Sequence, residues 1–141
     1  GYIEYRPCDT VPAKVAMSLP AFVKGLVFDS GNWEAVKELT KDWSYDDIVD
    51  ADTRAWKDGL QTEVHGKTLL TYAQELITFS NEKLHEFGRT EANDEDEAVH
   101  LAPLKEQIYI REKSFAEELR DLWNGEWNEN PARILEWAEG E

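Results

Sequence analysis

Two charged residues near the N-terminus, Glu4 and Arg6, have types and a spacing that could do chemistry. They lie in the stretch YIEYRPCD, where charged and apolar residues alternate as in a β-strand with one solvated face. On such a strand their Cα atoms would be about 7 Å apart. A carboxylate can ligate Mg²⁺, and an arginine can hold a phosphate or carboxylate through two parallel hydrogen bonds. The pair could therefore hold a Mg²⁺–phosphate group.

The same alternation is also typical of an ordinary exposed strand whose charges pair across strands, and the pattern alone favours that interpretation. The absence of a partner strand in the rest of the sequence changes this balance, because buried backbone N–H and C=O groups must be paired. Either residues 1–10 pair with a second copy of the chain, in a homodimer, or they belong to a sheet formed by preceding sequence. We therefore expect the chain to begin inside the catalytic sheet of a larger protein.

The composition excludes several classes of function. The 141 residues are enough for one domain, and 30 acidic against 15 basic residues give a net charge of −15. Such a charge disfavours nucleic acid and anionic membrane surfaces as partners. A single cysteine, Cys8, permits no intrachain disulfide, and together with the lack of a signal peptide or a spanning apolar run it leads us to expect a cytoplasmic protein.

A series of helices follows the predicted strand and must position it. Apolar periodicity and capping signals predict six or seven helices in residues 11–141, so the fold class is mainly α with one N-terminal strand. We take residues 1–10 as the strand of a catalytic sheet and residues 11–141 as a C-terminal helical domain. The predicted helices cover residues 13–29, 33–43, 44–57, 67–87, 101–113, 114–123 and 131–140.

Several local features of these helices can be predicted. The 13–29 helix is apolar almost all round, so it should be buried on most sides, with a kink at Pro20. Ser44 and Ser114 each precede an acid by three residues, as in a capping box. The segment SGN at 30–32 is expected to be a turn, and the acidic segment 91–97 a solvated loop or a helix start. Several of the six tryptophans should be buried.

Other chemistry finds little support in the sequence. His65, His85 and His100 lack the spacing of a zinc site, and the acidic segment 91–97 lacks the glycine and the ligand spacing of a Ca²⁺ loop. There is no glycine-rich phosphate loop, no dinucleotide fingerprint and no G-x-S-x-G nucleophile motif. The tryptophan pairs 33/43 and 123/127 are expected to pack in the core rather than stack on a ligand.

The order of several motifs resembles the C-terminal part of the glutamate–cysteine ligase family, especially the branch that includes the plant-type enzymes. In that family a strand reading roughly LEMRGAD precedes a helix containing ALPAFWVGLLYD; the corresponding segments here are IEYRPCD and SLPAFVKGLVFD. Further on, VKELTKDW resembles a family helix that ends in Asp-Trp, and LWNGEWNENP resembles its late Tyr-Asn-Gly-x-Trp turn. The resemblance is spread over nearly all of the chain.

This resemblance implies a glutamine-synthetase-like enzyme with an active site on an antiparallel sheet. ATP with Mg²⁺ would phosphorylate the γ-carboxylate of glutamate, and the amine of cysteine would attack the acyl phosphate, in the first step of glutathione biosynthesis. Glu4 would be a Mg²⁺ ligand, Arg6 the catalytic and substrate-binding arginine, and Asp9 a substrate-orienting acid. The partners would be glutamate, cysteine, ATP and the missing N-terminal catalytic part, and the fragment would be inactive alone.

The sequence departs from the family pattern directly after the arginine. Pro7 and Cys8 replace small residues, and Thr10, Val11 and Pro12 replace a Gly-Pro-Trp segment. These changes leave the amino-acid pocket open, so a related carboxylate–amine ligase is one alternative. A non-enzymatic acidic helical module that binds a protein partner is the other.

Overall fold

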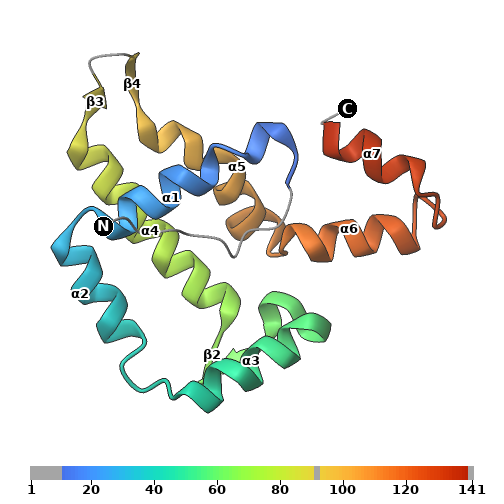
Figure 1. Cartoon of the computed structure of the whole chain (residues 1–141), viewed down its shortest axis with the longest axis horizontal. Helices are drawn as coiled ribbons and strands as arrows, with labels where there is room; N and C mark the ends of the chain where they lie inside the picture. The colour runs from blue at the N-terminus through green and yellow to red at the C-terminus, as the bar shows by residue number, and fades with distance from the viewer. Residues whose placement is uncertain (1–10, 91–92, 140–141) are drawn as a thin grey trace, which may run out of the picture.

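The structure is a computed structural model of the chain and describes residues 11–90 and 93–139. It is mainly helical, with two short hairpins, which confirms the predicted number of helices for the described residues (Figure 1). The seven α-helices are α1 (Ser18–Val27), α2 (Ser30–Leu39), α3 (Tyr45–Asp58), α4 (Leu69–Phe87), α5 (Ala102–Lys105), α6 (Phe115–Asn124) and α7 (Ala132–Glu139). Shorter helical segments are η1 (Ala13–Val15), η2 (Gly59–Gln61), η3 (Glu97–Leu101) and η4 (Glu106–Arg111), and the strands are β1 (Glu63–Val64), β2 (Lys67–Thr68), β3 (Arg89–Thr90) and β4 (Asn93–Asp96).

Helix α4 crosses the middle of the molecule and contributes to each of its three core clusters (Figure 1). Thr68 caps its start by accepting a hydrogen bond from the Thr71 N–H at 3.2 Å, and Gly88, at φ +73°, ends it. The predicted helix over 67–87 is confirmed from Leu69 to Phe87, whereas Lys67 and Thr68 form β2 instead. Its buried residues Leu84, Ile77 and Tyr72 face three different groups of neighbours, so α4 links the other helices into one structure.

Helix α1 packs against α4 through small residues rather than large apolar ones. Its buried positions are Ser18, Ala21 and Gly25, which share one face. A Cβ atom added to Gly25 would lie 2.3 Å from Ser80 Oγ and 2.5 Å from Ser80 O. The Ser80 hydroxyl also donates a 3.0 Å hydrogen bond to the Phe22 carbonyl. The two backbones thus approach as closely as a glycine permits.

The prediction of a single kinked helix over 13–29 is wrong. The segment begins with the short 3-10 helix η1, and α1 starts afresh at Ser18, which places Pro20 in its first turn. A proline there breaks no intrahelical hydrogen bond, so no kink is needed. The expected burial on most sides is also wrong, because Val27 is 41 % and Phe28 73 % exposed.

Helix α2 begins where the sequence predicted a turn. The Asp29 carboxylate accepts a hydrogen bond from the Asn32 N–H at 3.0 Å, so residues 30–32 form the first turn of the helix. The Asn32 side chain then donates to the carbonyls of Gly25 at 2.7 Å and Phe79 at 2.9 Å. One side-chain amide therefore ties α2 to both α1 and α4.

Both predicted capping boxes are present. The Ser44 hydroxyl accepts from the Asp47 N–H at 3.2 Å at the start of α3, while the Asp47 carboxylate accepts from the Ser44 N–H at 2.7 Å. Ser114 and Glu117 make the equivalent pair of bonds at the start of α6. Glu117 also accepts a 3.2 Å hydrogen bond from the Leu60 N–H, which anchors α6 to η2.

Two short hairpins were not predicted. β1 pairs antiparallel with β2 around His65 and Gly66, which have positive φ angles of +48° and +77°. β3 pairs antiparallel with β4, so part of the acidic segment expected as a loop or helix start is strand, and η3 begins at Glu97. The predicted N-terminal strand lies outside the described residues, and no sheet of the described chain tests it.

The predicted helix over 101–113 is divided in two. Residues 102–105 are α-helical, residues 106–111 widen into a π-helical turn, and Glu112 ends the segment in the left-handed region at φ +52°. A π-helical turn inserts one residue per turn and is often found at functional sites. It changes the direction in which the side chains of η4 point relative to α5.

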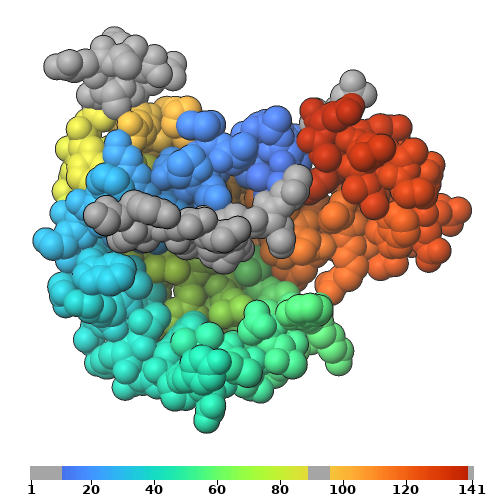
Figure 2. Space-filling view, in the orientation of Figure 1, coloured from blue at the N-terminus to red at the C-terminus, as the bar shows by residue number. Residues whose placement is uncertain are grey.

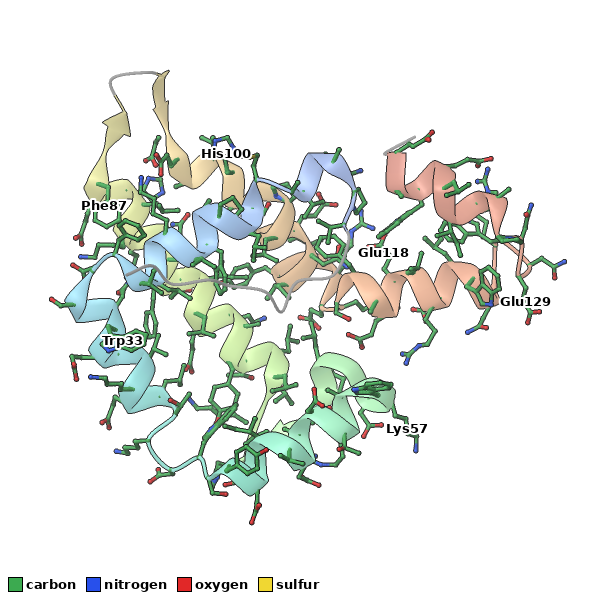
Figure 3. All side chains as sticks on the ribbon, viewed as in Figure 1. Trp33, Lys57, Phe87, His100, Glu118 and Glu129 are labelled. Atoms are coloured by element: carbon green, nitrogen blue, oxygen red, sulfur yellow. The ribbon has the colours of Figure 1, made fainter. Side chains whose placement is uncertain are left out.

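Most of the tryptophans lie at or near the surface, contrary to the prediction. Only Trp127 is buried, whereas Trp33 is 51 % and Trp56 84 % exposed (Figure 3). The contacts of α2 and α3 with the rest of the described chain use smaller side chains, such as Leu39 and Ala51, against Tyr72 of α4. None of the helices described has the length and apolar character needed to span a bilayer.

The close approach of α1 and α4 gives the first prediction. Gly25→Ala should lower the free energy of unfolding by about 1–3 kcal/mol, because the new methyl group overlaps the Ser80 backbone. Helix propensity alone would give the opposite sign, a gain of about 1 kcal/mol. Urea unfolding of the chain measures the difference. Glu34→Ala, an exposed change on α2, is the control and should stay within about 0.5 kcal/mol; a stabilised Gly25→Ala chain would contradict the packing argument.

Candidate functional site

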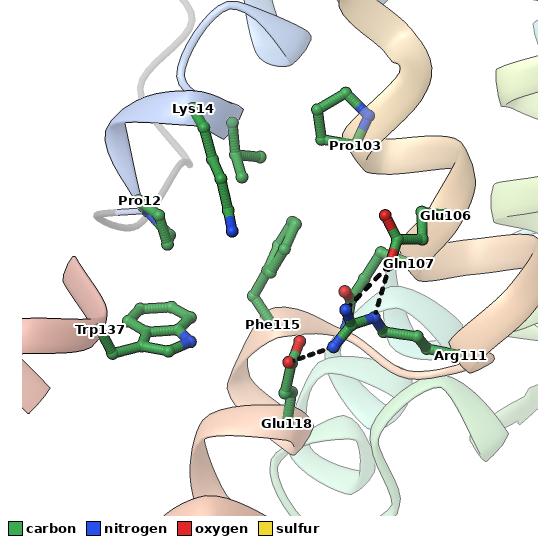
Figure 4. A pocket seen from close by; sticks show the side chains of 10 residues that line it. Pro12, Lys14, Pro103, Glu106, Gln107, Arg111, Phe115, Glu118 and Trp137 are labelled. Carbon is green, nitrogen blue, oxygen red and sulfur yellow. Dashed lines mark hydrogen bonds and ion pairs between the residues drawn. The ribbon is translucent and has the colours of Figure 1, made fainter. Parts of the chain in front are cut away.

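The residues predicted to do chemistry, Glu4, Arg6 and Asp9, lie outside the described part of the chain. The description starts at Val11, directly after them, and the first described residues line a small pocket of about 100 Å³ (Figure 4). We call it the Gln107 pocket. Its uncharged walls and its one lysine come from η1, α5, η4, α6 and α7: Pro12, Lys14, Pro103, Gln107, Phe115 and Trp137.

Local sequence features determine how each wall of the Gln107 pocket is formed. Pro12, whose φ of −52° suits a helix start, begins η1 and presents Lys14. The π-helical turn of η4 brings Glu106, Gln107 and Arg111 to the same side. The Ser114 capping box fixes the start of α6. Figure 2 shows α7 lying directly against η1, so residues from the two ends of the described chain meet here.

Charge in the Gln107 pocket is concentrated in one ion-pair cluster. The Arg111 guanidinium donates to Glu106 Oε1 from Nη2 at 2.9 Å and to Glu118 Oε1 from Nη1 at 2.5 Å. The hydrogen bond with Glu106 and then the charge of Glu118 raise the pKa of Arg111 above its ordinary value. The cluster has one guanidinium against two carboxylates, a net charge of −1, and it joins η4 to α6, which is a structural role at the edge of the pocket.

Two other groups in the pocket have no such partner. Gln107 is 3 % exposed, and its Nε2 makes no hydrogen bond with any described residue. Lys14 forms no ion pair within residues 11–90 and 93–139. Sequence reasoning missed both residues, because a glutamine and a lysine 93 positions apart carry no recognisable spacing.

A second, more open hollow of about 480 Å³ lies between α2, α4 and the β1–β2 hairpin. Trp43 packs edge-on against Tyr72, with ring centroids 5.0 Å apart, and its indole N–H donates to the Tyr72 hydroxyl at 3.3 Å. That hydroxyl donates in turn to the Val64 carbonyl at 3.1 Å. Because these polar groups satisfy one another, the hollow has a structural explanation, and Trp43 belongs to a core cluster as predicted.

The histidines are separate from one another in the structure. His65 Nε2 lies 3.2 Å from Asp47 Oδ2, His85 pairs with Asp96, and the His100 carbonyl accepts from the Ser18 hydroxyl at 2.7 Å. Within residues 11–90 and 93–139 no three histidine, cysteine or acidic side chains are grouped so that they could hold a metal ion.

Comparison with known proteins identifies similar sequences over almost the whole chain. The model of the glutamate-cysteine ligase family 2 (GCS2) matches residues 1–136. A chloroplastic glutamate–cysteine ligase of Solanum lycopersicum is 27 % identical over 135 residues, and one of Arabidopsis thaliana is 28 % identical over 138 residues. Each alignment covers 96 % of this chain and 24 % of the relative. The chain therefore spans about a quarter of the length of these relatives.

These names correct one expectation from the sequence. The relatives from Solanum lycopersicum, Arabidopsis thaliana and Nicotiana tabacum are all named chloroplastic, which contradicts the expected cytoplasmic location. The composition and the single cysteine indicate a reducing compartment but do not identify which one. They could therefore not distinguish the cytoplasm from a plastid.

The Asp47 capping box leads to a prediction about pH. Hydrogen bonds from the Ser44 side chain and backbone, and then from His65, lower the pKa of Asp47 to about 2. An unfolded aspartate titrates near 3.9, so this carboxylate stabilises the fold above about pH 4, and the contribution is lost as the pH falls toward about 2. Urea unfolding between pH 5 and 2 should show Asp47→Asn less stable than the parent at pH 5, with the gap closing toward pH 2.

Asp46→Asn, on the same turn of α3 but outside the capping box, is the control for this pH series. It should leave the pH dependence of the free energy of unfolding as in the parent chain. A constant gap between Asp47→Asn and the parent over the whole range would contradict the proposed charge effect.

Proposed function

The chain belongs to the glutamate–cysteine ligase family, and from this premise we propose that the full-length protein joins the γ-carboxylate of glutamate to the amine of cysteine, a step of glutathione biosynthesis. The observation that carries the proposal is the family match over residues 1–136, which includes both the predicted strand and the helical domain. Because the chain spans about a quarter of its relatives, we place most of the active site outside these 141 residues and expect no ligation by this chain alone. The relatives' names support a plastid location.

We assign the chemistry within this chain to its first residues. Activation of a carboxylate by ATP gathers negative charge on the transferred phosphoryl group, so catalysis depends on positioning and on neutralising that charge. Arg6 would contact the transferred phosphoryl group or the substrate carboxylate, Asp9 would orient the substrate, and Glu4 would be a Mg²⁺ ligand. Since the described residues contain no metal-binding group of three, the other ligands would come from the rest of the protein.

The described helices would support this site rather than carry it. α1 begins eight residues after the end of the predicted strand, with η1 between them, and its contacts with α4 and α2 fix its position. Large apolar side chains remain exposed on the surface, among them Phe28, Trp56 and Ile110 at 73–84 % exposure. We propose that the remaining three-quarters of the full-length protein cover part of this apolar surface.

A second candidate function follows from the residues after Arg6. Pro7 and Cys8 stand where the family pattern has small residues, and this is the part of the strand nearest the amino-acid pocket implied by the resemblance. A related ligase that joins glutamate to another amine would share the same activation step. A coupled assay of the full-length gene product with glutamate, ATP and a panel of amino-acid amines distinguishes the two.

Arg6 is the first residue to test in that assay. Arg6→Ala in the full-length protein should lower turnover by about two orders of magnitude, the usual effect of removing one group that stabilises developing charge. Arg54→Ala, an exposed change on α3, is the matched control and should leave turnover unchanged. Turnover of Arg6→Ala within a few-fold of the parent would rule out the proposed role.

Glu4 should affect the response to the metal rather than the binding of amino acids. Glu4→Gln keeps the size of the side chain but removes its charge, so the Mg²⁺ concentration for half-maximal activity should rise by about tenfold or more, with little change in the KM for the amine. Titration of activity with Mg²⁺ at saturating substrates measures this. Glu34→Gln on α2 serves as the control, and an identical Mg²⁺ titration for Glu4→Gln and the parent would disprove the assignment.

A further inference from the structure

Helix α3 exposes its large apolar side chains and buries a small one. Ala51 is buried and packs with Val64 and Tyr72 in one of the core clusters. Tyr45 and Trp56 of the same helix, by contrast, are 77 % and 84 % exposed. A surface helix ordinarily turns its apolar face toward the core. α3 therefore has a second apolar face, which the described chain does not cover.

The exposed apolar side chains of α3 lie along one stripe. Four residues follow one another at intervals of four, three and four positions, which places them on the same side of an α-helix: Tyr45, Val49, Asp52 and Trp56. Ile48 lies one turn before Asp52 and widens the stripe, and Ile48 and Val49 are 50 % and 47 % exposed. We call these five residues the α3 stripe. Figures 1 and 2 show α3 at the edge of the molecule, with the rest of the described chain on one side of it.

A single charged group, Asp52, lies in the middle of the α3 stripe. Its carboxylate is exposed and forms no ion pair with the residues that the structure describes. The two cations of α3 do not serve it. Arg54 donates to the Asp50 carboxylate and to the Glu63 carbonyl, both at 2.8 Å, and Lys57 is turned about 100° around the helix axis from the end of the stripe. The stripe itself therefore contains one carboxylate and no cation.

This carboxylate limits what can cover the stripe. A partner that buries Tyr45 and Trp56 also removes Asp52 from water, and a carboxylate that loses its water without gaining a cation is costly. The cover must therefore combine apolar side chains with a lysine or an arginine opposite Asp52. The α3 stripe of a second copy does not meet this requirement, because it has the same carboxylate and no cation, and each chain has a net charge of −15.

We propose that the α3 stripe docks against a segment of the full-length protein outside these 141 residues, and that this segment presents a basic side chain to Asp52 among apolar ones. The chain spans 24 % of the length of its relatives, so the remaining polypeptide is large enough to cover a whole helix face. Tyr45 and Trp56 would be the anchors, since tyrosine and tryptophan are frequent among the residues that contribute most to an interface. The inference rests on the proposed full-length ligase and names the contact that positions α3 within it.

Hydroxyl-radical footprinting with mass spectrometry measures this contact directly. Oxidation of Tyr45 and Trp56 should be about tenfold slower in the full-length protein than in the 141-residue chain, because the core of an interface excludes water. Trp127 is buried in the chain itself, at 6 % exposure, so its oxidation should be slow in both proteins and serves as the control.

Two substitutions at Asp52 test the basic side chain. In the full-length protein Asp52→Asn removes the attraction and Asp52→Lys replaces it with repulsion. Oxidation of Trp56 should therefore rise in the order parent, Asp52→Asn, Asp52→Lys. Asp46→Lys makes the same charge change in the first turn of α3 but outside the stripe, so Trp56 should stay protected. Both Asp52 variants should leave the oxidation of Trp56 in the 141-residue chain unchanged, which separates docking from the folding of α3.

Three results would overturn the proposal. Equal oxidation of Trp56 in the chain and in the full-length protein would show that no segment covers the stripe. Protection that appears in the chain alone as its concentration rises would assign the stripe to a second copy. Protection that survives Asp52→Lys would rule out a basic side chain opposite Asp52. The oxidation needs neither ATP nor amino acids, so a full-length protein that shows no ligation in the coupled assay can still show this contact, and the two proposals fail separately.

Discussion

The close crossing of α1 and α4 at Gly25 and Ser80 is the constraint on which the rest of the structure depends. A side chain at Gly25 would occupy the space of the Ser80 backbone, so the two helices can meet here only because position 25 has no Cβ. Once they meet, the Ser80 hydroxyl reaches the Phe22 carbonyl, and Asn32 bridges both helices from α2. The position of α1 in turn sets where η1 lies, and with it the first wall of the Gln107 pocket.

The parts of this fold that could be predicted are those determined by local sequence. Capping boxes depend on residues three positions apart, and the sequence predicts both of them, as it predicts the end of α4 at Gly88. The resemblance to the ligase family could also be recognised from the sequence, because it depends on the order of short segments. The family match over residues 1–136 confirms it.

The features that could not be predicted depend on contacts between distant segments. Apolar residues almost all round 13–29 predicted burial on most sides, yet the closest packing uses Ser18, Ala21 and Gly25, which a hydrophobicity pattern does not identify. The π-helical turn of η4 and the positive φ of His65 have no clear sequence signal either. The catalytic residues implied by the resemblance precede the described residues in sequence, so the predicted site remains a prediction, while the Gln107 pocket is known from the structure alone.

The exposed tryptophans and the buried glutamine both depart from the usual distribution of apolar and polar side chains. A large apolar side chain on the surface and a polar one in the interior each cost free energy unless something covers the first and pairs with the second. Trp56 has no cover within the described chain, and the relatives are about four times longer than the sequence, which supplies a source of cover. Gln107 is different, because the residue is buried, at 3 % exposure, and its Nε2 has no hydrogen-bond partner among the described residues. The two departures from ordinary burial therefore differ in kind: the exposed tryptophan lacks an apolar cover, and the buried amide lacks a hydrogen-bond acceptor, within the part of the chain that the structure describes.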